Sequence, residues 1–122
     1  MKNDLDHTFT RIERLARERG LPKSESATSY GTPALKLRSR TFVRLNDAET
    51  LVLLCPPEQK ALLMEISPDI YFETDHYVGY PAVLVRLDVI GDEELSLRLE
   101  DAWRFRAPAT LARQRPTAAP RD

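Results

Sequence analysis

The segment YFETDHYVGYPAVLVRL, residues 71–87, brings four aromatic rings and one of the chain's two histidines into ten residues. Exposed tyrosines can stack on unpaired nucleic-acid bases, and a histidine can bind a metal or transfer protons. Metal binding and catalysis need further groups around His76, and no second histidine, cysteine or suitably spaced carboxylate accompanies it. Two interpretations stay open. The segment is either a structural wall, in which Phe72 and one of Tyr77 or Tyr80 are buried, or a stacking surface formed by Tyr77 and Tyr80.

Four basic residues lie close together between positions 34 and 45, where the chain has no acid: Lys36, Arg38, Arg40 and Arg44. Such residues attract phosphates, and a β-hairpin that carries them can lie along a groove of DNA. A two-residue turn at Ser39-Arg40 places Lys36 and Arg38 on one face of the hairpin. Arg40 at the tip then lies near them, whereas Arg44 lies apart, which predicts modest affinity. The turn pair lacks glycine and asparagine, so a longer loop is also compatible.

The charge of the chain is unevenly distributed although its net value is −1. Residues 46–101 contain thirteen acids and three bases, giving −10, whereas residues 34–45 and 102–122 each carry +4. A chain of this kind can present a basic surface to a polyanion. Two alternatives remain: the charges cancel across the folded surface, or the acidic span from Asp47 to Asp101 offers a surface to a basic protein partner.

Length and composition indicate a globular protein of 122 residues with one domain, expected at residues 1–115. The end of the chain, residues 116–122, is rich in proline, alanine and charge, so we expect it to be disordered. No apolar run approaches the roughly 18–20 residues of a membrane-spanning helix, and the charged N-terminus does not resemble a signal peptide. A single cysteine, Cys55, fits a reducing compartment. We therefore expect a cytoplasmic protein that does not contact the membrane.

No signature of an enzyme is present in the sequence. A glycine-rich phosphate loop, a nucleophile elbow and a paired-histidine metal motif are all missing. Cys55 follows four apolar residues, which is typical of a buried and unreactive thiol. We therefore expect no catalytic residues, no metal and no cofactor.

Three helices are indicated by apolar spacing. Apolar residues recur on one face of a helix at residues 5–19, which Gly20 and Pro22 end. Pro57 suits the first position of a second helix, expected over residues 58–66. A third helix, with Asp92 as its cap, is expected over residues 92–106. The residues expected to be buried in the second and third helices are Leu62, Leu63, Ile66, Leu95, Leu99, Ala102 and Trp103.

Extended segments separate these helices. The basic hairpin supplies two strands, and the continuously apolar segments LVLLC and AVLVRL are typical of strands buried on both faces. Short connections between them favour antiparallel pairing. The order helix, strands, helix, strands, helix predicts the α+β class, with an antiparallel sheet of about five strands and helices packed against it.

Three segments together resemble the MmcQ/YjbR family of small bacterial proteins: TSYGTPALKLRSRTFVRL, LLCPPEQKALLMEISPDIYFETDHYVGYPAVLVRLD and LEDAWRFRAP. The resemblance extends from about Leu5 to Leu111, and its most specific part is the aromatic segment with Gly79 and Pro81. One departure is the hairpin turn, which often carries glycine and lysine in the family and is Ser39-Arg40 here.

The resemblance implies an α+β fold likened to a double-wing DNA-binding domain. It favours weak and largely sequence-independent DNA binding through phosphate contacts. The residues expected to make them are Lys36, Arg38, Arg40 and Arg44 of the hairpin, with Arg104 and Arg106 of the last helix. The alternative is a protein–protein adaptor, and neither interpretation includes enzymatic activity.

Overall fold

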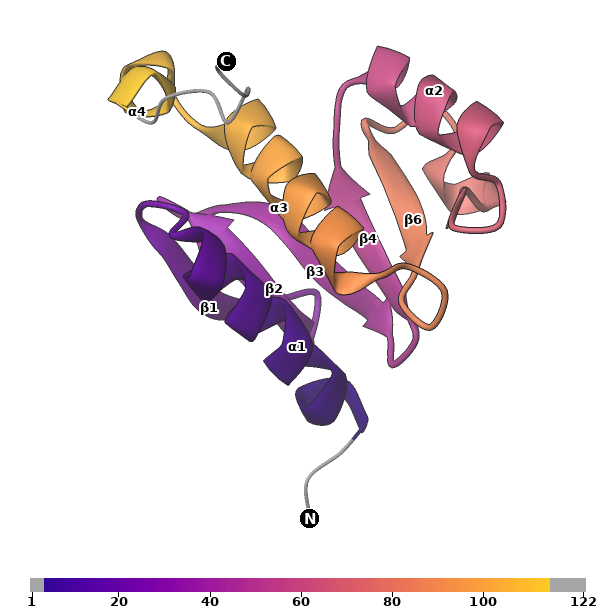
Figure 1. Ribbon diagram of the computed structural model, residues 1–122, viewed down its shortest axis with the longest axis horizontal. Coiled ribbons are helices and arrows are strands. Elements are labelled where there is room, and N and C mark those ends of the chain that lie inside the picture. The colour runs from indigo at the N-terminus through magenta and orange to yellow at the C-terminus, as the bar shows by residue number, and fades with distance from the viewer. Residues whose placement is uncertain (1–3, 115–122) are drawn as a thin grey trace.

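The computed structural model describes residues 4–114 of the chain. The tail predicted at residues 116–122 therefore lies outside the described residues. Within them the two long helices lie side by side on the same face of a sheet, and the shorter helices lie beyond its ends (Figure 1). The helices are α1 (Asp4–Arg19), α2 (Pro57–Ile66), the single-turn 3-10 helix η1 (Asp75–Tyr77), α3 (Asp92–Arg106) and α4 (Ala109–Gln114).

The described part of the chain forms one sheet of six strands, in which all neighbours are antiparallel. The order across the sheet is β1-β2-β3-β4-β6-β5. This architecture confirms the predicted α+β fold, with six strands where about five were expected; the shortest strand, β5, contains two residues. The strands are β1 (Ser24–Ser29), β2 (Thr32–Leu37), β3 (Arg40–Asp47), β4 (Thr50–Leu54), β5 (Tyr71–Phe72) and β6 (Ala82–Arg86).

The two long helices bury the apolar stripes that their sequences predict. In α1, Phe9, Ile12 and Ala16 are buried, and Gly20 ends the helix with a φ of 69°. In α3 the four predicted residues are all fully buried. Trp103 of that group also donates a hydrogen bond of 2.8 Å from Nε1 to the carbonyl oxygen of Pro22, which ties α3 to the chain just after α1. The predicted extents and buried faces of these two helices are therefore confirmed.

The prediction for α2 is correct in extent and wrong in orientation. Leu63 is buried, but Leu62 and Ile66 are 53% and 67% exposed. The side chain that α2 buries instead is Lys60, whose ammonium group binds backbone carbonyls of the 73–81 loop. An amine that leaves water must find such partners, so this contact, and not the apolar pattern, orients the helix.

The hairpin between β2 and β3 differs from the prediction in its turn. The two turn residues are Arg38 and Ser39, with φ values of 52° and 73°, so the turn contains two residues and Leu37 pairs with Arg40. A bulge then shifts the register between Leu35 and Lys36. Neither feature has a glycine or asparagine to signal it. The turn expected at Ser39-Arg40 would pair Leu35 with Arg44, whereas the structure pairs Leu35 with Val43 and Arg44 with Ala34.

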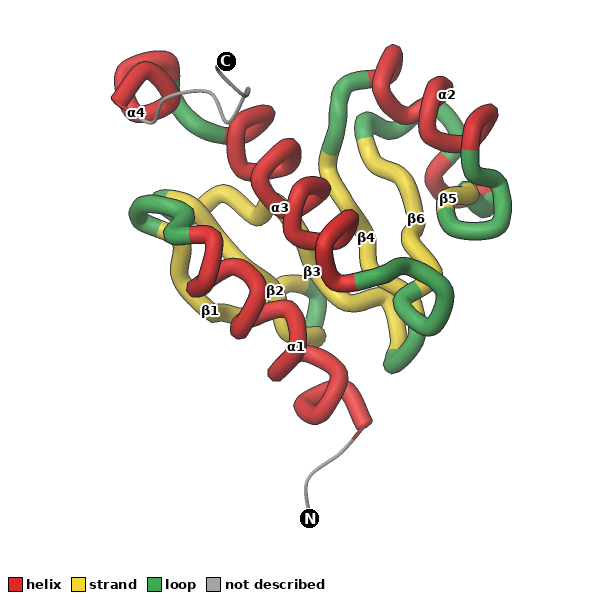
Figure 2. The backbone as a smooth tube through the Cα atoms, viewed as in Figure 1, coloured by secondary structure: helices red, strands yellow, loops and turns green. Residues whose placement is uncertain are grey.

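Alternation along the strands gives the sheet two different faces. One face packs against α1 and α3 and contains Leu45, Leu51 and Val85, which are opposite one another in the register. The other face carries a second, smaller apolar cluster of Val52, Leu84, Tyr77 and Ala82. In Figure 2 both long helices lie in front of the strands, so this second face is turned away from them. It is the open face of the sheet.

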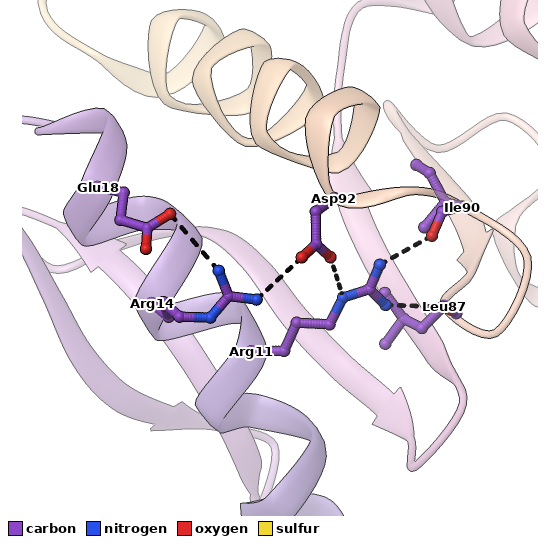
Figure 3. Close-up of polar contacts among 6 residues, drawn as sticks. All are labelled: Arg11, Arg14, Glu18, Leu87, Ile90 and Asp92. Carbon is purple, nitrogen blue, oxygen red and sulfur yellow. Dashed lines mark hydrogen bonds and ion pairs between the residues drawn. The ribbon is translucent and has the colours of Figure 1, made fainter.

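A cluster of charged residues joins α1 to the start of α3 (Figure 3). The Asp92 carboxylate accepts hydrogen bonds from Arg11 Nε at 2.7 Å and from Arg14 Nη2 at 2.9 Å. Arg11 also donates to the carbonyl oxygens of Leu87 and Ile90. The predicted capping role of Asp92 is wrong: Gly91 is the cap residue, and Asp92 lies in the first turn and holds α1 instead.

Replacement of Asp92 by Asn should weaken this connection in a pH-dependent way. The bonds from Arg14 and Arg11 lower the pKa of the Asp92 carboxyl group. A lowered pKa stabilises the fold above the unfolded-state value, and the contribution disappears as the pH falls through the native value. Because the carboxylate is half exposed, the effect is small. Urea unfolding should show a lower free energy of unfolding for Asp92→Asn than for the unmodified protein at pH 7. This difference should disappear at a pH at which the carboxyl group of Asp92 is protonated in the native protein.

The matched control is Glu93→Gln, which removes an exposed acid from the same turn. It removes the same charge from the helix N-terminus but no ion pair with α1, so it should lower the free energy of unfolding at pH 7 less than Asp92→Asn does. An equal loss for Asp92→Asn at neutral and acid pH would show that the charge of Asp92 does not contribute.

Candidate functional site

A groove of about 730 Å³ lies on the open face of the sheet. Residues from five separate segments line it: the β1–β2 turn, the β2–β3 hairpin, β4, the 73–81 loop with the start of β6, and the end of α3. Four rings and three guanidinium groups dominate the lining. The lining residues are Ser29, Tyr30, Ser39, Arg40, Thr41, Arg44, Val52, Leu54, His76, Tyr77, Tyr80, Pro81, Ala82 and Arg106.

The aromatic segment forms one wall of this groove. Tyr77 is buried, whereas Tyr80 is 53% exposed. The rings of His76 and Tyr80 are stacked with centroids 5.6 Å apart, and both meet Tyr77 edge-on. Phe72, which we expected to be buried, is only partly so, and the Arg86 guanidinium lies over its ring at 4.0 Å. The segment therefore combines the two interpretations: Tyr77 is structural, and Tyr80 offers a ring at the surface.

Lys60 of α2 fixes the backbone of this wall. Its Nζ donates to the carbonyl oxygens of Tyr77 at 2.7 Å and Tyr80 at 2.8 Å, and it pairs with Glu73 at 2.8 Å. The side chain of Lys60 is only 7% exposed. Three partners thus compensate one buried ammonium group, and they hold both ends of the Tyr77–Tyr80 turn against α2.

Arg44 of β3 forms the floor between the two sides of the groove. Its Nη2 donates to the Tyr77 hydroxyl at 2.7 Å, and its Nη1 donates to Thr32 Oγ1 and to the Leu45 carbonyl oxygen. Its guanidinium carbon also lies 5.3 Å from the ring centroid of Tyr30, which is a cation–π distance. Arg44 was predicted to lie apart from the other basic residues, and the structure instead places it in the same groove as Arg40, because the bulge puts it opposite Ala34.

Arg106 brings a further charge from the end of α3. Its Nε donates to the Thr41 carbonyl oxygen at 3.1 Å, and the side chain also lines the groove. Partial burial lowers the pKa of Arg106, and the nearby charge of Arg40 lowers it further. Two like charges therefore line the hairpin end of the groove and lie near enough to repel each other.

The remaining predicted residues lie outside the groove lining. Lys36 is half-buried in β2, where its register partners are Glu25 and Thr41. Arg38 is exposed in the hairpin turn. Arg104 binds Glu100 at 2.9 Å, one turn back in α3. Of the six predicted basic residues, the structure brings together Arg40, Arg44 and Arg106.

Tyr30 is a groove residue that the sequence analysis did not identify. It occupies the β1–β2 turn before Gly31, has a φ of 54° and is 90% exposed. The signal was present in the sequence as a Tyr-Gly pair between two extended segments, because a glycine with positive φ commonly marks a hairpin turn.

Other reactive groups are not assembled into a site in the described residues. Cys55 is fully buried, and burial raises the pKa of its thiol to about 11, so the thiol stays protonated at neutral pH. Between residues 4 and 114 no cluster of three or more histidine, cysteine or acidic side chains could hold a metal ion. Nor does that part of the chain include a helix with the length and apolar character needed to cross a membrane.

Comparison with known proteins assigns the chain to a family. The YjbR family model matches residues 19–105, which include the whole sheet and most of α3, so the chain belongs to the YjbR family. No solved structure gives a significant match.

Three curated relatives show the same similarity: the uncharacterized proteins Rv2570 and MT2646 of two strains of Mycobacterium tuberculosis, and Mb2600 of Mycobacterium bovis. Each is 44% identical to the chain over 52 residues, which is 43% of this chain and 40% of the relative. The chain thus matches well under half of the length of these relatives.

Replacement of Lys60 by Met should loosen the aromatic wall. The variant keeps the aliphatic stem but leaves the Tyr77 and Tyr80 carbonyls and Glu73 without their shared donor. We expect a loss of about 1–3 kcal/mol in the free energy of unfolding, as for other buried polar groups without partners. Amide hydrogen exchange should also become faster at residues 77–82, and urea unfolding gives the stability.

The matched control is Lys36→Met, which removes a half-exposed lysine from the same open face. It should change the stability little. Unaltered exchange at residues 77–82 in Lys60→Met would mean that the loop does not depend on the lysine.

Proposed function

We propose that the protein binds DNA in the cytoplasm through the groove on the open face of its sheet, without enzymatic activity. Phosphate groups bind at its arginines, and the contacts are weak and independent of sequence. The observation that carries this proposal is the composition of the groove. Among the described residues that line it are Arg40, Arg44 and Arg106 and no acid, although the chain has more acidic than basic residues.

The electrostatics of the groove favour an anionic ligand. Several arginines elsewhere in the fold are paired with acids, as Arg19 and Arg104 are with Glu100. Arg40 and Arg106 instead lie near each other, and their repulsion is relieved when an anion binds between them. The planar guanidinium group suits a phosphate because it donates two parallel hydrogen bonds. A phosphodiester backbone supplies such anions in series.

The hairpin extends this basic surface towards the solvent. Lys36 and Arg38 adjoin the groove on β2 and at the turn, so they can contact neighbouring phosphates. The hairpin has no Asn or Gln to read a base edge before Asn46, at the far end of β3. Phosphate contacts carry no sequence information, so little specificity is expected from them.

The dependence of affinity on salt tests this proposal. If Lys36, Arg38 and Arg40 each neutralise one phosphate, these three residues alone should contribute about −2 to −3 to the slope of the logarithm of the affinity against the logarithm of the salt concentration, and Arg44 and Arg106 should steepen it further. Replacing Arg38 and Arg40 together by Ala should reduce the magnitude of this slope by about 2. It should also weaken binding equally on DNA of different sequences. Fluorescence anisotropy with labelled DNA measures both quantities between low and physiological salt.

The matched control is Arg17→Ala/Arg113→Ala, which removes the same charge from exposed positions outside the groove lining. Its salt dependence should equal that of the unmodified protein. No binding at low salt, or equal losses in the two double variants, would overturn the DNA proposal.

A protein–protein adaptor is the second candidate function. The observation that favours it is the outer face of α2, where Leu62 and Ile66 are exposed one turn apart. Glu58 and Glu65 belong to the same helix, so a partner with a basic, partly apolar surface would suit this face. Failure of the DNA experiment would make this the better explanation.

A further inference from the structure

We infer that the groove takes an unpaired segment of a DNA strand in preference to a double helix, with bases stacked on Tyr30 and Tyr80. This inference rests on the proposed function and specifies the form of DNA that is bound. It is carried by two exposed aromatic rings in the lining of a basic groove, which come from two separate segments, the β1–β2 turn and the 73–81 loop.

Tyr30 is held in an unfavourable conformation that leaves its ring in the solvent. Its φ of 54° lies in the left-handed region, where glycine, asparagine and aspartate are favoured and bulky residues are rare. An asparagine at this position would form the turn more easily. The residue is 90% exposed, so burial does not offset the cost, and the contact that its ring makes with the described part of the chain is with a charged partner, the Arg44 guanidinium. A strained residue with an exposed ring indicates a binding role.

Tyr80 offers a ring that is already supported on one side. His76 stacks against it with the ring planes 25° apart, and the Tyr77 ring braces both of them edge-on. The Tyr80 backbone is fixed by the bond from Lys60, so the ring is carried on an ordered turn. A base placed on the exposed side of Tyr80 would continue the stack that His76 begins.

The groove itself connects these two rings through Arg44. Its guanidinium lies against Tyr30 and donates to the Tyr77 hydroxyl, so the positive charge lies between the aromatic sides. Arg40 and Arg106 lie at the hairpin end. Rings with charge between them match the alternation of bases and phosphates along a single strand. In a duplex the base faces are covered by neighbouring pairs and only the edges are accessible, so the rings would have nothing to stack on.

The size of the groove agrees with this occupant. Its volume of about 730 Å³ is within the range of roughly 300–1,000 Å³ found for sites that enclose small ligands. It can therefore hold a short stretch of nucleotides, with the rest of the strand crossing the adjacent hairpin.

The test compares one labelled oligonucleotide of about twelve residues, single-stranded and annealed to its complement, by fluorescence anisotropy at low salt. The single strand should bind more tightly. The variant Tyr30→Asn/Tyr80→Ala should lose about tenfold or more of its affinity for the single strand, because each lost stacking contact contributes about 1–3 kcal/mol. Its affinity for the duplex should be unchanged.

Three controls separate stacking from folding. Asn relieves the strain at position 30, so Tyr30→Asn alone should be at least as stable to heat as the unmodified protein while binding the single strand more weakly. Tyr30→Phe/Tyr80→Phe keeps both rings and should retain the single-strand affinity. Phe105→Ala removes a partly exposed ring from α3, outside the groove lining, and should have no effect.

The outcomes distinguish this inference from the proposed function. Equal or tighter binding of the duplex, or full single-strand affinity in Tyr30→Asn/Tyr80→Ala, overturns the preference for an unpaired strand. The proposal of DNA binding stands in that case if Arg38→Ala/Arg40→Ala still flattens the salt dependence. Absence of binding to either form at low salt overturns both.

Discussion

The buried ammonium group of Lys60 is the constraint on which the candidate site depends. A charge removed from water must be compensated, and the partners of Lys60 are the carbonyl oxygens of Tyr77 and Tyr80 and the carboxylate of Glu73. To supply them, the 73–81 loop must fold back over α2. The same requirement turns α2 so that Lys60 points inward, which leaves Leu62 and Ile66 in the solvent. One buried amine thus sets both the aromatic wall and the exposed face of the helix.

The position of the groove follows from how the sheet is covered. Both long helices pack on one face, where the larger apolar cluster lies, and the smaller cluster around Val52 and Leu84 remains on the other. The 73–81 loop covers that smaller cluster with Tyr77 and ends there. Over β2 and β3 the open face keeps polar and charged residues instead, among them Thr41 and Arg44. The groove is the boundary between the covered and uncovered parts of this face.

Sequence patterns predicted those elements whose apolar residues recur at one regular helical spacing. The extent of α3 and its four buried residues follow from their spacing, and Pro57 fixed the start of α2. The hairpin was not predictable in the same way, because Arg38 and Ser39 adopt positive φ without a glycine and the bulge beside Leu35 has no local signal. Those two features decide that Arg44 joins the groove. The orientation of α2 was missed because it depends on a contact with a loop that lies far along the chain.

Two local costs of this fold lie at the groove. Away from the groove several opposite charges are paired, as Asp92 is with Arg11 and Arg14, and α1 ends at Gly20, which accepts a positive φ at no cost. At the groove, Tyr30 holds a conformation suited to asparagine, and Arg40 lies beside Arg106. Neither arrangement favours the folded state, so the buried core must offset both. A ligand that carries both negative charge and flat rings would relieve the repulsion between Arg40 and Arg106 and would stack on the exposed ring of Tyr30. The coincidence of these two costs in one groove, on the one open face, is the strongest physical argument that the groove is a binding site.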